Sequence, residues 1–375
     1  MSGVNLSNAG HSKKKPGARG RRLPTGNSLL FYLCAASLFI FECIATAQTS
    51  SQLGSIPPPP DAQSEWKPFL GDFQQIDGTE VLIVHELDGK LYLLRPNREE
   101  LELTRRDLNS FFYDDSHPDE KYVITFIQSH GIATSLLGLL GSYQRLPYEK
   151  SGTANAVIRA VRPVEELRAG ALAATPPAEN RSLRRPDLVE LTELDSAIHL
   201  DIRYATANDF LGVPVYTQAR AFLQRPAAEA LLRVLHKLQP LGYGLLIHDG
   251  YRPWYVTKIF WDATPAEGKI FVADPAQGSR HNRGCAVDLT LYDLKTGQPI
   301  EMTGGYDEMS PRSFPNYPGG TSLQRWHRDL LRRAMESEGF TVYESEWWHF
   351  DYKDWREYGI LNIPFEKLSI GSAAK

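Results

Sequence analysis

The sequence predicts an α+β protein in which a small all-β domain precedes a larger domain that mixes helices and strands. Short apolar runs broken by turn residues fill residues 66–164, whereas helix-type and strand-type patterns alternate from Asp187 onward. The length of 375 residues also exceeds that of one typical domain. A formal net charge of -4 argues against nucleic acid as a partner, because it provides no basic surface.

The first 47 residues have the pattern of a secretory signal peptide. Residues 1–28 contain six Lys and Arg and no acidic residue, and an apolar run follows from Leu29 to Ala47. The run ends in Ala45-Thr46-Ala47, a small-x-small cleavage pattern. An uncleaved membrane anchor is the alternative, since a bilayer span needs ~20 apolar residues. We therefore expect an exported protein of the periplasm or cell envelope, with no other membrane contact.

Composition predicts two linkers around the all-β domain. Residues 48–64 are rich in Ser, Gln and Pro, which favours a stiff extended linker. The all-β domain is expected over residues 65–164, and the Ala-, Pro- and Arg-rich residues 165–186 are interpreted as a second linker before a domain at 187–368. Outside the signal segment Cys285 is the sole cysteine, so a metal would have to be held by histidine and carboxylate.

Strand signals dominate the first domain. Residues 79–84 and 90–94 flank Asp88-Gly89, which predicts a β-hairpin, and residues 122–127 are a further strand candidate. We expect a small β-sheet or barrel. Its scattered histidines lack the spacing of a site and are expected to be surface or structural residues: His85, His117 and His130.

Helix signals mark the second domain. Pro226 and Pro253 each begin a predicted helix, and residues 245–247 between them have the character of a buried strand. Thr321 and Gln324 have the spacing of a capping box at the start of a third helix.

A first reactive segment lies around a predicted strand at residues 287–291. Alternation with apolar residues places Asp288 on the polar face of this strand, and His281 lies in the loop before it. The imidazole and the carboxylate could face one metal ion. The alternative is a solvent-facing histidine and an aspartate that pairs with Arg283.

A second segment places Glu346 and His349 around two tryptophans. A third ligand from His349 would complete a His, Asp, His set, and catalytic zinc sites use three protein ligands plus water. Glu346 could then be the base that accepts the proton of the water. Because residues three apart on a flat strand face opposite ways, this interpretation requires a bulge or turn near the tryptophans. The alternative is an aromatic core strand with a histidine at its edge.

A third segment, Asp249-Gly250-Tyr251-Arg252-Pro253, joins the buried strand to the second helix. A guanidinium at Arg252 can donate two hydrogen bonds to an oxyanion. The alternative is a helix-terminal arginine that pairs with Asp249.

Taken together, these motifs resemble those of the D-alanyl-D-alanine dipeptidases, which belong to the zinc D,D-peptidase superfamily and include the vancomycin-resistance type. The resemblance covers roughly residues 187–365, in the order of the family. It rests on DIRYATANDF at 201–210, DGYRP at 249–253, SRHNRGCAVD at 279–288, YDEMS at 306–310 and EWWH at 346–349. It implies a central antiparallel sheet with flanking helices.

The resemblance also implies the roles of individual residues. One zinc ion per chain would be held by His281, Asp288 and His349, with Glu346 as general base and Arg252 as transition-state stabiliser. The expected substrate contacts are Tyr204, Ser279, Asp249 and Asp307, with Tyr204 and Asp307 near the free ammonium group.

The expected activity is hydrolysis of a small D,D-dipeptide, D-alanyl-D-alanine, by metal-activated water. Two alternatives stay open: a D,D- or L,D-carboxypeptidase that acts on peptidoglycan stem peptides, and a non-catalytic, zinc-stabilised cell-wall binding module. The all-β domain lies outside the resemblance and could contact the cell wall.

Overall fold

The computed structural model describes residues 53–114, 121–138, 141–147 and 160–368. The predicted signal segment, residues 48–52 of the first predicted linker and His117 lie outside the described residues. The chain divides into two units, Met1–Gln48 and Thr49–Lys375, and the description below concerns the second. Over the described ranges, no helix combines the length and the apolar character needed to cross a membrane.

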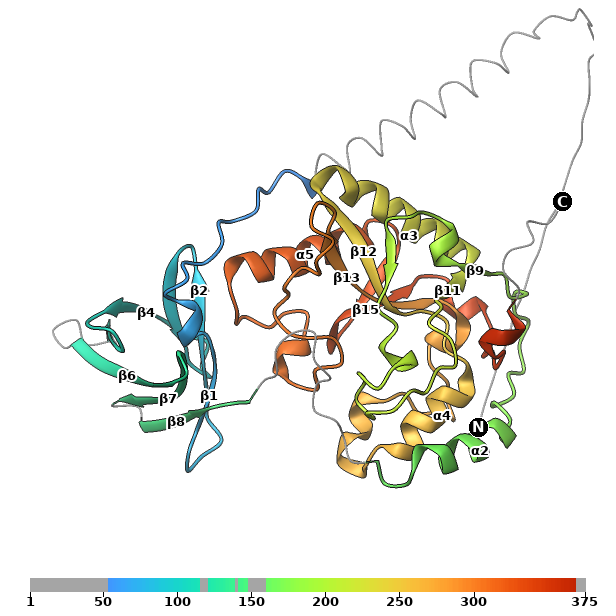
Figure 1. Ribbon diagram of the computed structural model, residues 1–375, viewed down its shortest axis with the longest axis horizontal. Helices are drawn as coiled ribbons and strands as arrows, with labels where there is room; N and C mark the ends of the chain where they lie inside the picture. The colour runs from blue at the N-terminus through green and yellow to red at the C-terminus, as the bar shows by residue number, and fades with distance from the viewer. Residues whose placement is uncertain (1–52, 115–120, 139–140, 148–159, 369–375) are drawn as a thin grey trace, which may run out of the picture. The chain divides into compact units, whose positions relative to one another are not determined.

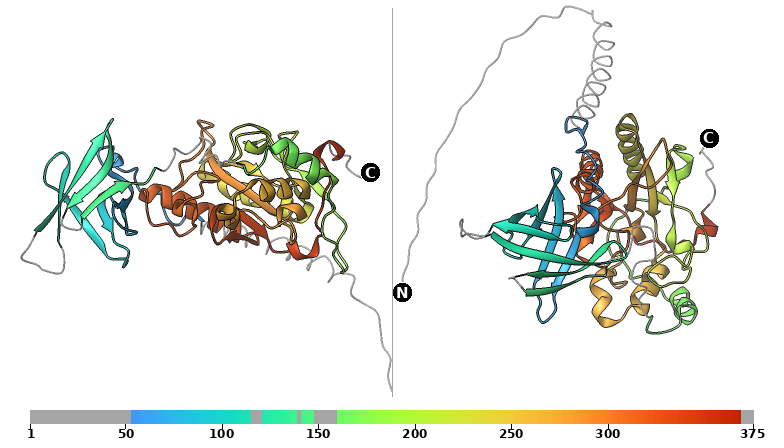
Figure 2. Two further views of the ribbon diagram at one scale, coloured as in Figure 1. Left: turned by 90° about the horizontal axis from the view of Figure 1, so that it is seen from below. Right: turned by 60° about the vertical axis from the view of Figure 1, so that its left-hand side comes forward.

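The first part of this unit is a closed antiparallel barrel, as Figures 1 and 2 show. Eight strands of the described chain form it in sequence order, and β1 pairs with both β2 and β8. The strands are β1 Gly71–Gln75, β2 Val81–Leu87, β3 Lys90–Leu94, β4 Glu100–Arg105, β5 Ser110–Asp114, β6 Lys121–Ser129, β7 Ile132–Gly138 and β8 Gly141–Arg145. Phe69, Phe111 and Phe126 fill the interior, with ring centroids 5.0–5.6 Å apart. Of the two expected forms, a small β-sheet or a barrel, the structure has the barrel.

The predicted hairpin is also present. β2 pairs with β3 through Asp88 and Gly89. Both turn residues have positive φ, 50° and 80°, as a two-residue type I′ turn requires.

A five-stranded sheet forms the centre of the second domain, in the order β10-β12-β13-β15-β14. Its strands are β10 Ile198–Leu200, β12 Tyr243–Asp249, β13 Ala286–Asp293, β14 Phe340–Tyr343 and β15 Glu346–Tyr352. β10 is parallel to β12, and the other pairs are antiparallel. The expected central antiparallel sheet is therefore present except at this edge, where the β10–β12 pair departs from it. The physical reason is that helix α3 lies in the connection from β10 to β12, and parallel neighbours need such a crossover.

The three predicted helices are present as α3 (Arg225–Leu238), α4 (Trp254–Ala263) and α5 (Ser322–Glu336). α3 has a proline in its first turn, α4 begins directly after Pro253, and α5 has the complete Thr321–Gln324 capping box. Two short strands, β9 (Leu188–Glu190) and β11 (Phe222–Gln224), pair beside the sheet.

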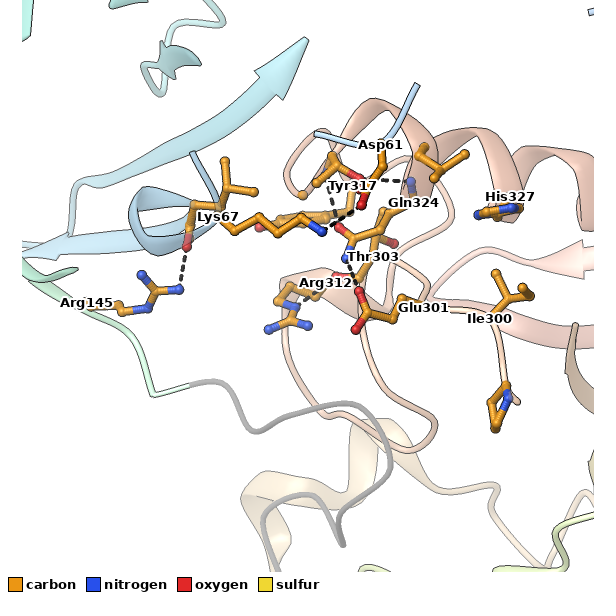
Figure 3. Close-up of a pocket in the computed structure, with 16 residues that line it drawn as sticks. Asp61, Lys67, Arg145, Ile300, Glu301, Thr303, Arg312, Tyr317, Gln324 and His327 are labelled. Carbon is orange, nitrogen blue, oxygen red and sulfur yellow. Dashed lines mark hydrogen bonds and ion pairs between the residues drawn. The ribbon is translucent and has the colours of Figure 1, made fainter. Parts of the chain in front are cut away.

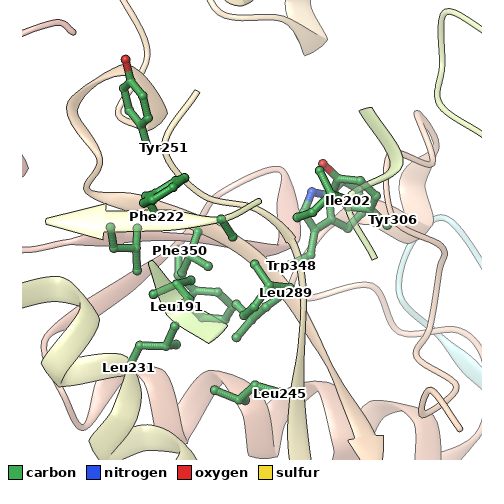
Figure 4. Close-up of a cluster of buried hydrophobic side chains, with 14 of the residues drawn as sticks. Leu191, Ile202, Phe222, Leu231, Leu245, Tyr251, Leu289, Tyr306, Trp348 and Phe350 are labelled. Carbon is green, nitrogen blue, oxygen red and sulfur yellow. The ribbon is translucent and has the colours of Figure 1, made fainter. Parts of the chain in front are cut away.

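Helices α3 and α5 cover one face of the sheet. Leu231 of α3 lies in one apolar cluster with Leu245 of β12, Leu289 of β13 and Phe350 of β15 (Figure 4). Because side chains alternate along a strand, Asp288 next to Leu289 points to the opposite face. The polar site therefore lies on the face that α3 and α5 leave uncovered.

The segment interpreted as a second linker contains helix α2 (Val164–Ala173). Val164, Leu167 and Ala171 are buried in the core of the second domain, and α2 packs against α4. The interpretation as a linker is therefore wrong for residues 165–173. The Ala- and Arg-rich composition concealed the helical spacing of these three apolar residues.

Candidate active site

Strand register brings the reactive segments together. Asp249 of β12 pairs with Asp288 of β13, and Asp288 pairs with His349 of β15. Three segments far apart in the sequence thus form one row across the sheet. His281 joins them from a 3-10 turn, residues 281–283, that ends at Gly284 with φ 67° just before β13.

The three predicted metal ligands converge and are buried: His281, Asp288 and His349. His281 Nε2 lies 3.1 Å from His349 Nδ1. Asp288 Oδ1 lies 3.4 Å from His281 Nε2 and 3.0 Å from His349 Nδ1. Ligand atoms at 2.0–2.1 Å from a tetrahedral zinc ion are about 3.4 Å apart, so this triangle has the size of one face of such a site.

A second observation supports a cation at this triangle. Within the described chain, no group gives the buried Asp288 Oδ1 a well-directed hydrogen bond. A buried carboxylate oxygen that lacks such a bond is costly unless a cation neutralises it. The residues present therefore fit a metal ion.

Hydrogen bonds outside the triangle fix which atoms face it. His281 Nδ1 lies 2.7 Å from the Gly250 carbonyl, to which it can donate, so Nε2 carries the lone pair. His349 Nε2 lies 2.9 Å from Asp351 Oδ1, so the lone pair of His349 is on Nδ1.

The electrostatics of the site favour positive charge. Burial lowers the pKa of His349, but the contacts with the Asp288 and Asp351 carboxylates outweigh it and raise this pKa to about 10. Burial opposes the charged form of Asp288 too, yet His281 and His349 hold the pKa of its carboxyl below the usual range. The same negative field that protonates an imidazole attracts a divalent cation.

Glu346 lies on the same side as His349, as the predicted role requires. The β14–β15 register shifts between Val342, which pairs with Phe350, and Tyr343, which pairs with Glu346. This irregularity confirms the predicted bulge and places Glu346 Oε2 3.8 Å from His349 Nδ1. Burial raises the pKa of the Glu346 carboxyl.

Arg252 is held by Asp249 beneath it. Arg252 Nε and Nη2 contact Asp249 Oδ2 at 2.9 and 2.7 Å, and Nη2 lies 3.9 Å from Asp288 Oδ2. Asp249 is 1% exposed and also accepts a hydrogen bond from the Tyr216 hydroxyl at 2.7 Å. The structure thus places Asp249 as the partner of Arg252 and not on the cavity wall, which corrects the expected substrate contact.

A cavity of about 300 Å³ opens over the triangle. Its wall includes the ligands, Glu346 and Arg252, together with three of the expected substrate contacts: Tyr204, Ser279 and Asp307. Asp307 accepts a hydrogen bond from the Tyr204 hydroxyl at 2.8 Å and has φ 57°, a strained conformation for a residue other than glycine. Burial, together with Asp288, raises the pKa of Asp307 well above its usual value.

A larger cavity, of about 540 Å³, lies elsewhere in the unit (Figure 3). Residues such as Lys67, Glu301, Arg312 and Gln324 line it, and none of the three candidate ligands does. Charge alone therefore does not identify the reactive cavity; the convergence of ligand atoms does.

Sequence reasoning missed two side chains that touch the ligands. Asp351 holds His349, and Tyr306 donates a hydrogen bond to Asp288 Oδ2 at 3.2 Å. The i, i+2 spacing of His349 and Asp351 on one strand was a usable signal, because such residues share a face. Tyr306 lies between β13 and α5, where no strand period relates it to Asp288.

Comparison with known proteins agrees with this region of the chain. Residues 184–365 match the family described as D-ala-D-ala dipeptidase. The D-alanyl-D-alanine dipeptidase of Escherichia coli (strain K12) is 35% identical over 179 residues, which are 48% of this chain and 91% of that protein. Those of Streptomyces coelicolor and Enterococcus faecalis (strain V583) are each 35% identical, over 45% and 44% of this chain and 92% and 90% of their own lengths.

Proposed function

Because the chain belongs to the D-ala-D-ala dipeptidase family of metallopeptidases, we propose that it hydrolyses D-alanyl-D-alanine to two D-alanines with one zinc ion. The observation that carries this proposal is the triangle of His281, Asp288 and His349 with Glu346 and Arg252 around one cavity. The signal-like N-terminal segment supports export of the protein, so we propose that the reaction takes place in the periplasm or cell envelope.

Zinc is proposed because two imidazole nitrogens and one carboxylate oxygen suit its preference for nitrogen and oxygen ligands. His281, Asp288 and His349 would hold the ion. A zinc ion held by these residues would supply a Lewis acid that activates water for attack at neutral pH.

Glu346 is proposed as the general base. It lines the cavity beside His349, and its raised pKa is closer to neutrality than that of an exposed glutamate. A carboxylate in this position accepts the proton of the attacking water and then donates it to the leaving amine.

Arg252 is proposed to stabilise the oxyanion that forms when the scissile carbonyl is attacked. The bonds to Asp249 hold the guanidinium in place before substrate binds. A preorganised donor does not have to reorient during the reaction, which is the basis of its catalytic effect.

Asp307 and Tyr204 are proposed to bind the free ammonium group of the dipeptide. Asp307 is a partly buried carboxylate at the wall of the cavity, and a cationic group would neutralise it. A substrate whose amino group is acylated would leave this carboxylate without a cationic partner. This arrangement favours a dipeptidase over a carboxypeptidase that acts on longer stems.

The test is a hydrolysis panel with the full chain and a measurement of its metal content. D-alanyl-D-alanine should be cleaved, and N-acetyl-D-alanyl-D-alanine should be cleaved far more slowly. Glu346→Gln should abolish turnover while the bound zinc is retained. Faster cleavage of the acylated peptide would favour the carboxypeptidase, and a zinc-loaded chain that cleaves neither peptide would favour a non-catalytic module.

A further inference from the structure

Tyr306 touches the candidate metal site from outside the ligand triangle. The residue is 2% exposed, and its hydroxyl donates to Asp288 Oδ2 at 3.2 Å. The other oxygen of this carboxylate, Oδ1, faces the two imidazole nitrogens at 3.0 and 3.4 Å. The two oxygens of Asp288 therefore have different partners.

The ring of Tyr306 is fixed on several sides. It stacks on His248 with centroids 4.4 Å apart and planes at 12°, and it meets the Trp348 ring edge-on at 5.7 Å. The Arg203 guanidinium lies 5.5 Å from its centroid. Figure 4 shows Tyr306 and Trp348 side by side at the edge of the apolar cluster.

The stack itself is anchored. His248 is 3% exposed, and its Nδ1 lies 3.3 Å from Asp201 Oδ2. Arg203 Nε donates to the same Asp201 oxygen at 3.1 Å. One carboxylate therefore holds both groups that enclose the Tyr306 ring, so the ring has little freedom to turn its hydroxyl away from Asp288.

Tyr306 and the residue after it line different cavities. It lines a cavity of about 750 Å³, whereas the next residue, Asp307, lines the smaller cavity over the metal ligands. The hydroxyl of Tyr306 donates to Asp288, which lines the smaller cavity. Removing the hydroxyl alone leaves the phenyl ring and its packing contacts in place.

We propose that Tyr306 is a positioning residue for the metal centre: its hydroxyl holds Asp288 Oδ2 and so directs Oδ1 to the metal. This inference rests on the metal site of the proposed function. Groups that orient ligands from outside typically contribute 10- to 100-fold to metal affinity. Without the hydroxyl, the Asp288 carboxylate can rotate and expose either oxygen or both.

The test compares Tyr306→Phe with a matched control, Tyr292→Phe, in the full chain. Tyr292 is also buried and lines the same larger cavity, and its ring stacks on His199 at 4.2 Å and 11°. Its hydroxyl lies near the Ala197 carbonyl and His199 Nε2, away from the metal ligands. The two substitutions therefore remove the same atom from similar surroundings.

Zinc affinity is measured by competition with a chromophoric chelator, and the cobalt-substituted proteins are compared by visible absorption. Tyr306→Phe should weaken zinc binding about 10-fold or more and change the cobalt spectrum, while Tyr292→Phe matches the unmodified chain in both. The melting temperatures of the metal-free proteins report whether each variant folds. Zinc affinity of Tyr306→Phe within twofold of the unmodified chain would overturn the inference.

These readouts do not depend on turnover. If the unmodified chain bound zinc tightly but cleaved no dipeptide, the proposed function would fail while the role of Tyr306 could still be measured. If Tyr292→Phe weakened zinc binding as much as Tyr306→Phe, the effect would belong to the packing of the stacked rings, and the inference would be overturned.

Discussion

The substitution Arg252→Lys separates the charge of this side chain from its geometry. Arg252 uses Nε and Nη2 to contact Asp249 Oδ2, at 2.9 and 2.7 Å. A lysine has one compact ammonium group on a flexible stem, so it cannot make the two-point contact with Asp249 and also hold a second donor rigidly toward an oxyanion. Loss of one oxyanion donor costs about 2.7–4 kcal/mol of transition-state stabilisation, so kcat should fall about 100- to 1000-fold.

Lysine is more informative here than alanine. Alanine would leave Asp249, which is 1% exposed, without its cation, and such a change costs about 3–5 kcal/mol of folding stability. Arg220→Lys is a suitable control, because Arg220 makes a similar two-point contact with Glu190, at 2.8 and 2.6 Å, and does not line the cavity.

The assay measures kcat and KM for D-alanyl-D-alanine at matched zinc content. Arg252→Lys should lose most of kcat and retain its zinc, and Arg220→Lys should behave as the unmodified chain. A kcat of Arg252→Lys within twofold of the unmodified value would refute the reasoning.

Three further predictions follow from other contacts. Asp351→Asn should weaken zinc binding about 10-fold, because the charge that orients His349 is lost; equal chelator competition curves would contradict this. Asparagine at position 307 tolerates the φ of 57°, so Asp307→Asn should keep the backbone conformation. Its KM should rise about 10-fold or more with a smaller effect on kcat, because a charge-assisted contact with the substrate ammonium is lost. An unchanged KM would exclude that contact. Burial lowers the pKa of His327 from 6.5 to about 4. Between pH 7 and pH 5, His327 is therefore protonated in the unfolded chain but stays largely neutral in the folded chain. The free energy of unfolding should fall by up to about 2 kcal/mol over this range. Urea titrations of the metal-free protein should show a smaller fall in His327→Gln, and an equal fall would contradict the assignment.

The sequence was sufficient to predict features that are stabilised by contacts between neighbouring residues. The capping box at Thr321 and the Asp88-Gly89 turn depend on neighbouring residues, and the structure has both. The bulge beside Glu346 could be inferred because the chemistry required two residues three apart to share a face.

Other features depend on tertiary contacts that no local pattern records. The pairing of β10 beside β12 and the burial of helix α2 are decided by packing against distant segments. The roles of Asp249 and Tyr306 in the site could not be predicted from the sequence for the same reason. Asp249 anchors the Arg252 guanidinium, and Tyr306 contacts Asp288 from a separate loop. Their roles follow from geometry in three dimensions and not from spacing.

The most direct test of the metal centre is the zinc content of the dialysed protein, measured by elemental analysis. The unmodified chain should retain one zinc per molecule, and His349→Ala should retain almost none, because two ligands do not complete the site. Glu346→Gln should retain one zinc as the control that leaves the ligands intact. An unmodified chain without zinc, or a His349→Ala variant with a full equivalent, would contradict the convergence of these three side chains on one ion.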